Sequence, residues 1–270
     1  MEPRFVIRLF GRLSVRCGDQ ELFSHTPLKA KELFAYLAVH RRRPHARESI
    51  ATLLWPECPS EQSRKNLRQA LWQLNSALRH GPSRCVDHVL IRETNHLEFH
   101  HDQQVWIDVE EFEAAFKARS PRRPVSDSDD VTRFAQAVQL YQGDLLEGFY
   151  AEWCLRERDR LKQIYFTMMD ALIANCESIK EYETGLEHAA AVLRSDGSRE
   201  CTHRAMMRLF YLSGDRVAAL RQYKRCEDAL REELGVGPDE ETRALRDRIA
   251  SGRPVDPGGN GGEFKNRDCA

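Results

Sequence analysis

The sequence lacks any run of about 18 consecutive apolar residues, the length at which a helix becomes a candidate for crossing a bilayer. Its start, MEPRFVIRLFGR, lacks an apolar segment followed by small residues, so we expect no secretory signal. Hydrophobic residues make up 41% and charged residues 31% of the 270 positions, a balance typical of globular proteins in water. We therefore expect about two domains and no membrane partner.

No CxxC pair occurs among the eight cysteines, which stand at positions 17, 58, 85, 154, 176, 201, 226 and 269. A metal site needs clustered ligands, and a secreted disulfide framework is normally denser in a shorter chain. The one histidine pair, His100 and His101, falls in an expected strand, where adjacent side chains point to opposite faces. The sequence therefore predicts no bound metal and free thiols in a reducing cytoplasm.

The common catalytic motifs are missing as well. The sequence holds no GxSxG, no HExxH and no GxxxxGK[ST]. Two acidic pairs occur, at positions 110–111 and 129–130, but adjacent side chains diverge on a helix and do not form an acid/base pair. We therefore expect no enzyme activity, no catalytic residue and no cofactor.

An excess of charge of either sign is also absent from the whole chain, whose formal net charge is −1. The charge is nevertheless uneven: residues 1–107 carry 16 Lys and Arg against 11 Asp and Glu, and eight of the ten histidines. Residues 108–270 carry 25 Lys and Arg against 31 Asp and Glu. This asymmetry indicates a polyanionic partner for the first part of the chain only.

The first part alternates strand and helix signals in a specific order. Residues 4–22 alternate apolar and polar positions, which predicts short antiparallel strands. A helix is expected from Thr26 as N-cap and Pro27, a second after Pro44, and a third over 60–79. The triple arginine 41–43 is either a solvated helix end or a phosphate-contacting run. With a hairpin in 86–107, this order predicts an α+β winged helix-turn-helix domain over 1–107.

From residue 108 onward the pattern is helical, with helices expected at 108–119, 129–142, 153–178, 181–194, 198–213, 215–234 and 238–250. Similar residues recur 34 positions apart, as in Ala171 and Ala205, or Val192 and Cys226. A helix-turn-helix period of 34 is typical of tetratricopeptide repeats. We therefore predict an all-α, tetratricopeptide-like domain over 108–252, followed by a disordered tail over 253–270.

The expected helix at 60–79, SEQSRKNLRQALWQLNSALR, has two different faces. At 100° per residue, Leu67, Leu71, Leu74 and Leu78 fall within about 60° of arc and predict the core face. The opposite face holds no acidic residue after position 61. Candidate DNA-binding residues on that face are Gln62, Lys65, Gln69, Trp72, Gln73 and Ser76, joined by Arg68 at its border and by Arg64 in an earlier turn of the helix.

The chemistry of this face favours a nucleic acid over solvent. Glutamine pairs bidentately with adenine, while arginine and lysine neutralise phosphates or read guanine. The missing carboxylates matter because phosphate would repel each of them. Trp72 either lies along a sugar or thymine methyl, or packs beneath the wing, and for so large a ring the second placement is favoured.

A wing contact is expected at the tip of the hairpin. Arg92, Asn95 and His96 stand there, and Arg92 suits a phosphate or the minor groove. Glu93 beside it disfavours such a contact, because a carboxylate repels the DNA backbone. These three residues are candidate DNA-binding residues of the wing.

Several segments resemble a known arrangement. LFGRLSVRCGDQEL, KAKELFAYLAVHRRRPHARESIATLLWP, SRKNLRQALWQLNSAL and VWIDVEEFEAA are similar to the OmpR-type winged helix of bacterial transcriptional activators. LYQGDLLEGFYAEWCLRERDRL and AMMRLFYLSGDRVAALRQYKRCEDALREELGVGPDEETRAL resemble the bacterial transcriptional activator domain. Together, over roughly residues 4–250, they resemble the SARP-type activators.

The resemblance implies a sequence-specific, DNA-binding transcriptional activator of the cytoplasm, associated with the nucleoid. It implies that the third helix enters the major groove, and that the hairpin meets the minor groove or the backbone. It further implies that the helical domain supports dimerisation and contacts RNA polymerase, with a homodimer bound to direct repeats of a promoter.

The sequence departs from this family at one point of the third helix. Related helices often read Ser-Arg-Leu-Arg where this chain has Trp72, Gln73, Leu74 and Asn75, so two arginines are missing. Losing two phosphate contacts would flatten the salt dependence by about 1.8 log units per log unit of salt. An alternative therefore stays open: a tetratricopeptide-type interaction adaptor whose winged helix has lost most of its DNA affinity.

Overall fold

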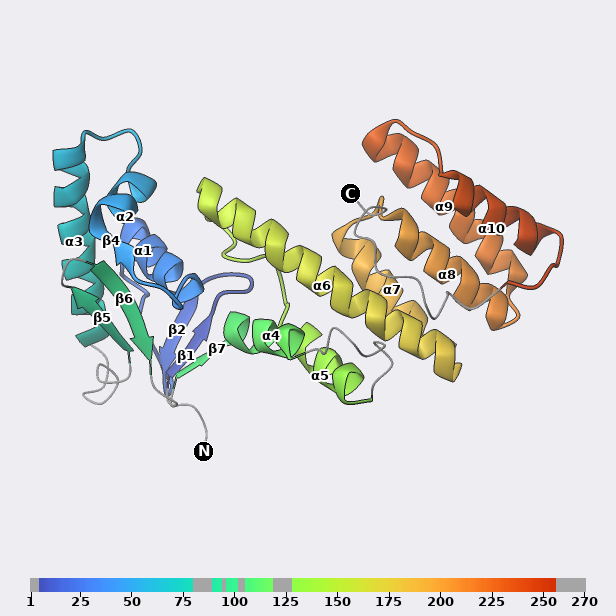
Figure 1. Ribbon diagram of the computed structural model, residues 1–270, viewed down its shortest axis with the longest axis horizontal. Helices are drawn as coiled ribbons and strands as arrows, with labels where there is room; N and C mark the ends of the chain where they lie inside the picture. Colours follow the sequence, from blue (N-terminus) through green and yellow to red (C-terminus); the bar gives the residue numbers. More distant parts are fainter. Residues whose placement is uncertain (1–4, 80–88, 94–95, 102–104, 119–127, 256–270) are drawn as a thin grey trace. The chain divides into compact units, whose positions relative to one another are not determined.

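The computed structural model describes residues 5–79, 89–93, 96–101, 105–118 and 128–255 (Figure 1). The chain forms two compact units, one of residues 1–114 and 139–162 and the other of residues 115–138 and 163–270. Helix α6 (Glu152–Ile179) contributes to both units. No helix among the described residues is both long and apolar enough to cross a membrane. The domain limits at residues 107 and 252 remain predictions.

The first unit begins with a four-stranded sheet in the order β3-β2-β1-β7. Its strands are β1 (Phe5–Arg8), β2 (Ser14–Cys17), β3 (Gln20–Glu21) and β7 (Val105–Ile107). Phe5 and Ile7 are buried and Arg8 is exposed, so the alternation in the sequence sets which face meets the core. The predicted antiparallel pairing holds for β1 to β3, while β7 joins β1 in parallel.

Three helices and a second sheet complete the winged helix. The helices are α1 (Leu28–Val39), α2 (Arg47–Leu54) and α3 (Ser60–Arg79). The sheet, in the order β4-β6-β5, consists of β4 (His45–Ala46), β5 (Val89–Glu93) and β6 (His96–His101). Leu33, Phe34 and Leu37 of α1 are fully buried, as their spacing predicts. The predicted winged helix-turn-helix is confirmed.

Two details at the ends of α1 differ from expectation. Thr26 is not the N-cap: its backbone N–H donates to the Phe23 carbonyl at 3.2 Å, and Pro27 takes the cap position without a side-chain bond. The Arg41 side chain is only 3% exposed, with Nε 3.1 Å from Glu110 and Nη2 3.4 Å from Glu113. Arg41 is therefore neither a solvated helix end nor free for phosphate, because acids from the later part of the chain enclose it.

The helix predicted for residues 129–142 is shorter in the structure, where α5 spans Ser128–Val138. The chain then turns so that residues 144–147 pair with the segment after β1. Gly11 donates to the Asp144 carbonyl at 2.8 Å, and Leu146 donates to the Leu9 carbonyl at 2.8 Å. These long-range bonds compete with continued helix and are invisible to a local pattern.

Among the cysteines that the structure describes, one differs from the prediction of free thiols. Cys17 is disulfide-bonded, so the prediction is wrong for this residue. The spacing of cysteines along the sequence does not predict disulfides, because residues far apart in the chain can meet in the fold. The described cysteines at 58, 154, 176, 201 and 226 are not disulfide-bonded.

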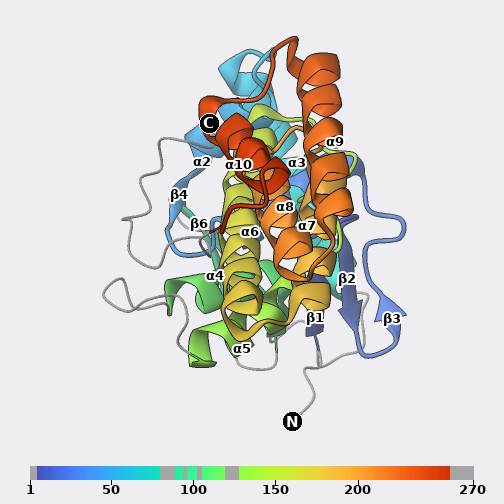
Figure 2. The ribbon, with the colours of Figure 1, turned by 90° about the vertical axis from the view of Figure 1, so that its right-hand side faces the viewer.

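The second unit is a stack of helices. It contains α5, the later part of α6, α7 (Tyr182–Ser195), α8 (Glu200–Leu212), α9 (Arg216–Leu234) and α10 (Glu240–Ala250). Helix α8 packs against α7 and α9, and α10 packs against α8 and α9 (Figures 1 and 2). Helix α4 (Asp108–Lys117) begins in the first unit.

The period of 34 residues has a structural basis in this stack. Ala171 and Ala205 are 3% and 7% exposed, and Val192 and Cys226 are both fully buried. Equivalent positions of successive helices therefore occupy equivalent places in the core, as in repeat proteins. The predicted tetratricopeptide-like fold is confirmed.

Gly185 shows how closely two of these helices approach. A Cβ atom built there would lie 3.1 Å from Cys176 Cβ and 3.1 Å from Leu209 Cδ1. We expect Gly185→Leu to lower the free energy of unfolding of the second unit by about 1–3 kcal/mol, because overpacking forces the neighbouring helices apart. Urea unfolding followed by circular dichroism measures this change. Thr184→Leu, on the exposed side of α7, is the control and should change stability by less than about 0.5 kcal/mol.

Candidate nucleic-acid interface

The face of α3 that meets the core is the predicted leucine stripe. Leu67, Leu71, Leu74 and Leu78 are between 0% and 3% exposed. Ser63, which the sequence reasoning passed over, is also buried and fixes the turn between α2 and α3. Its hydroxyl oxygen lies 3.2–3.3 Å from the carbonyl oxygens of Trp55, Cys58 and Pro59. The helix is therefore held against its unit along one side.

The other side of α3 faces outward within its unit. The exposed candidates there are Gln62, Arg64, Lys65, Arg68, Gln69 and Trp72. The half-buried candidates, one turn later, are Gln73 and Ser76. The first six candidates are thus more accessible than the last two, and Arg64 lies nearer to the leucine stripe than the others, on the side of α2.

Trp72 differs from the preferred expectation. Its side chain is 70% exposed, so the ring does not pack beneath the wing. A helix position about 130° from the centre of the leucine stripe cannot return a side chain to the core, however large the ring. The other expected placement, along a sugar or a thymine methyl of DNA, stays a prediction.

The charges of this face are partly engaged. Arg64 Nη2 lies 2.6 Å from Oε1 of Glu48, which belongs to α2, and the Gln62 amide donates to Asn66 at 2.8 Å. Among the residues that the structure describes, none forms an ion pair with Lys65 or Arg68. Two cations therefore remain available on this face for a phosphate, while a third is held by a carboxylate from the neighbouring helix.

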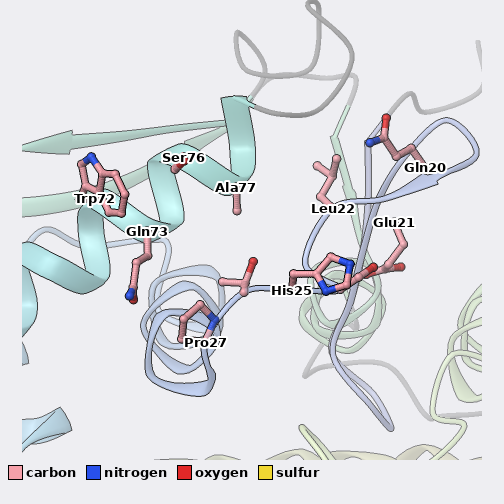
Figure 3. Close-up of a pocket in the computed structure, with 11 residues that line it drawn as sticks. Gln20, Glu21, Leu22, His25, Pro27, Trp72, Gln73, Ser76 and Ala77 are labelled. Atoms are coloured by element: carbon pink, nitrogen blue, oxygen red, sulfur yellow. The ribbon is translucent and has the colours of Figure 1, made fainter.

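A groove of about 540 Å³ runs beside the C-terminal half of α3 (Figure 3). Its walls come from α3 and from the segment that leads from β3 into α1, and its lining residues are Gln20, Glu21, Leu22, Ser24, His25, Thr26, Pro27, Trp72, Gln73, Ser76 and Ala77. Figure 3 shows Gln73 pointing from α3 toward Pro27. This wall explains why Gln73 and Ser76 are less exposed than Gln69.

The wing is an antiparallel hairpin of β5 and β6. Its register pairs Arg92 with Glu98 and Glu93 with Leu97. Of the predicted wing residues, His96 is exposed, and Arg92 lies in β5, where only the backbone is described. Asn95 lies outside the described residues. The wing contacts therefore stay predictions.

Two histidines near α1 do not add to the positive charge of the first unit. Burial lowers the pKa of His40 to about 4 and also lowers the pKa of His45. The rings pack with Tyr36 and Trp153, at centroid distances of 4.6 Å for Tyr36 and His40 and 5.1 Å for Tyr36 and Trp153. Both imidazoles are therefore neutral near pH 7, His45 in a buried position and His40 in a half-buried one. In the described parts of the chain, no three metal-ligating side chains cluster.

Comparisons with known proteins agree with this architecture. The model of the family "Bacterial transcriptional activator domain" matches residues 107–250. The chain is 22% identical over 264 residues to the transcriptional regulatory protein EmbR of Mycobacterium bovis and of Mycobacterium tuberculosis, covering 95% of this chain. It spans 66% of the length of these relatives.

A solved structure shows the same fold. The structure of Mycobacterium tuberculosis EmbR in complex with a low affinity phosphopeptide superposes with a TM-score of 0.67 at 22% identity, over 95% of this chain and 67% of that one. Both the winged helix and the helical unit that follows it thus have a counterpart in a transcriptional regulator. Since the family model covers more than half of the sequence, the chain belongs to the bacterial transcriptional activator domain family and has the arrangement of a SARP-type regulator.

Proposed function

We propose that the chain is a sequence-specific, double-stranded DNA-binding activator that inserts α3 into the major groove. The observation that carries this proposal is the outward face of α3 between Gln62 and Ser76, which holds amides and cations and no acid. The 20-residue helix is about 30 Å long and narrow enough for a groove about 12 Å wide. The buried leucine stripe keeps this face directed away from the core of its unit.

The side chains of this face have separate roles in the proposal. Lys65 and Arg68 neutralise phosphates and so set the position of the helix on the duplex. Gln69 and Gln73 read adenine edges, and the exposed Trp72 ring lies against a sugar or a thymine methyl. Arg64 and Gln62 at the start of the helix, Ser76 at its later end, and Arg92, Asn95 and His96 in the wing complete the interface.

The remaining parts of the proposal concern partners. The family assignment and the tetratricopeptide-like fold support a helical unit that contacts RNA polymerase and mediates a homodimer on promoter direct repeats. Such a regulator works at the nucleoid in the cytoplasm and needs neither a cofactor nor enzyme activity. Helix stacks present extended surfaces to other proteins, which suits this second unit to partner contact.

A second function is favoured by one observation on the helical unit. Ile179, Val217, Leu234 and Val236 are between 53% and 61% exposed, so the helical unit offers apolar side chains that a partner protein can cover. With the two family arginines absent at Gln73 and Asn75, the alternative is an interaction adaptor with little DNA affinity.

Binding of the purified chain to genomic fragments at 50 mM and 200 mM salt separates the two functions. Between about these concentrations, the affinity of a protein that binds mainly phosphates falls by several orders of magnitude. A DNA-binding regulator retards a subset of fragments and loses affinity steeply at the higher salt. Absence of retardation even at the lower salt would exclude the proposed function and favour the adaptor.

Replacement of the two glutamines tests the reading of bases. We expect Gln69→Ala to cost about 1–3 kcal/mol on the preferred duplex and to relax preference at one base pair. Gln73→Ala should have a smaller effect, because the wall of the groove already covers part of this side chain. Affinity for unrelated duplexes should stay within about twofold, since amides contribute little to phosphate binding. Unchanged footprints for both variants, measured on the same fragments, would contradict the assignment.

A further inference from the structure

The ion pair between Glu48 and Arg64 joins the two helices of the helix-turn-helix on their outer side. Glu48 stands in the first turn of α2, and its Oε1 lies 2.6 Å from Arg64 Nη2 on α3. Both side chains are largely exposed, 74% for Glu48 and 59% for Arg64. The pair is thus open to solvent and lies next to the face that the proposed function assigns to DNA.

The fold thereby places a carboxylate beside a face that the sequence of α3 leaves free of acids. A negative charge in the first turn of α2 is favoured by the helix dipole. The first helix of a helix-turn-helix crosses the DNA backbone, where phosphates repel a carboxylate. An exposed ion pair contributes little to folding stability, so the winged helix does not depend on this pair for its fold.

An arginine held in this way has donors to spare. The guanidinium offers five N–H groups in a fixed plane, and the contact with Glu48 engages the Nη2 atom. The remaining groups can still donate to the O6 and N7 atoms of a guanine, a contact that depends on orientation. Contact with a phosphate of unrelated DNA depends on charge instead, and Glu48 cancels most of that charge.

We infer that Glu48 is a positioning residue that sets sequence specificity: it orients Arg64 for a base and withholds it from the phosphates of unrelated DNA. This inference rests on the proposed DNA-binding function. Discrimination between the preferred sequence and unrelated DNA would then depend on a residue of α2 as well as on the residues of α3. Removing the carboxylate should therefore strengthen binding to unrelated DNA more than binding to the preferred sequence.

The test uses the full chain and two duplexes, one selected from a randomised library by the unaltered protein and one with the same bases scrambled. For Glu48→Gln, we expect affinity for the scrambled duplex to rise about 3- to 10-fold at 0.1 M salt, with a salt dependence steeper by about 0.9 log units. Affinity for the selected duplex should change less than about twofold, so the ratio between the duplexes falls.

Two comparisons separate positioning from bulk charge. Glu57→Gln removes an equal charge from an exposed residue of the turn between α2 and α3 and should leave the ratio unchanged. In an Arg64→Ala background, Glu48→Gln should have no further effect on ratio or salt dependence, because its role acts through Arg64. An equal effect of Glu57→Gln, or a persisting effect without Arg64, would overturn the inference.

The outcomes also distinguish this inference from the function on which it rests. If the unaltered protein selects no duplex from the library, the proposed function and the inference fail together. If it selects one, and Glu48→Gln leaves the ratio and the salt dependence as they were, only the role of Glu48 is overturned. Circular dichroism of Glu48→Gln should match the parent, because both side chains of the pair are exposed.

Discussion

Replacing Lys65 and Arg68 together by glutamate should abolish detectable DNA binding at 0.1 M salt while leaving the winged helix folded. Both side chains are exposed on α3, and among the described residues neither is held in an ion pair, so the substitutions remove no internal contact. In the proposed complex each side chain neutralises one phosphate. Electrophoretic retardation of the selected duplex measures the loss.

The expected size follows from counterion release. Two lost phosphate contacts lower the salt dependence by about 1.8 log units per log unit of salt, which corresponds to about 60-fold in affinity at 0.1 M salt. The two new carboxylates are repelled by the backbone and weaken binding further. Selected and scrambled duplexes should lose affinity to a similar degree, because phosphates carry no sequence information.

A charge-matched control uses α9 in the second unit. Arg221 and Arg225 are exposed, and replacing both by glutamate changes the net charge of the chain by the same amount. This variant should bind DNA within about threefold of the parent. Equal losses in the two variants would mean that total charge, and not the face of α3, governs binding, and the proposed interface would then be wrong.

The leucine stripe of α3 could be predicted because it depends on local geometry alone. With 3.6 residues per turn, four leucines fall on one side of any helix with this sequence, and the structure buries all of them. The period of 34 residues is local in the same sense, since each repeat packs mainly on its neighbours. Patterns of this kind determine faces without knowledge of the tertiary structure.

Long-range partners could not be predicted, and several differences from expectation involve one. Arg41 is buried because it pairs with Glu110 and Glu113 of α4, which lie about 70 positions later in the chain. Arg64 of α3 likewise pairs with Glu48 of another helix. The parallel pairing of β7 with β1 likewise joins residues about 100 positions apart. The expected placement of Trp72 beneath the wing is wrong for a different reason: the angular position of a residue on its helix, and not the size of its ring, decides whether the side chain is buried.

The largest expected effect on stability concerns Asp108, the first residue of α4. The residue is 3% exposed. Its carboxylate accepts hydrogen bonds from the backbone N–H groups of Leu9 at 2.8 Å, Phe10 at 3.0 Å and Val109 at 2.7 Å. It therefore fixes the end of the N-terminal sheet to the start of α4. Asp108→Ala leaves three buried donors without this acceptor and should lower the free energy of unfolding by about 3–6 kcal/mol.

Tryptophan fluorescence during urea unfolding measures this change, since all four tryptophans (Trp55, Trp72, Trp106 and Trp153) lie in the first unit. A loss of this size approaches the whole stability of a typical domain, so the midpoint should shift to low urea. Asp19→Ala is the control, because that side chain is fully exposed and should change stability by less than about 0.5 kcal/mol. Equal effects would show that the N–H groups of Leu9, Phe10 and Val109 do not depend on Asp108.

The pH dependence gives a second, independent measure of the same group. Burial raises the pKa of Asp108 to about 6, above its value in the unfolded chain, even though three N–H donors favour the carboxylate. Because the folded state binds the proton more tightly, the contribution of this group to stability is fully present below about pH 4. It is lost as the pH rises through about 6, by roughly 3 kcal/mol.

In Asp108→Asn the side chain no longer titrates. The free energy of unfolding of the parent minus that of the variant should therefore decrease by roughly 3 kcal/mol as the pH rises from below about 4 to above about 6. A difference that stays constant with pH would mean that Asp108 is ionised throughout and that its N–H bonds outweigh its burial.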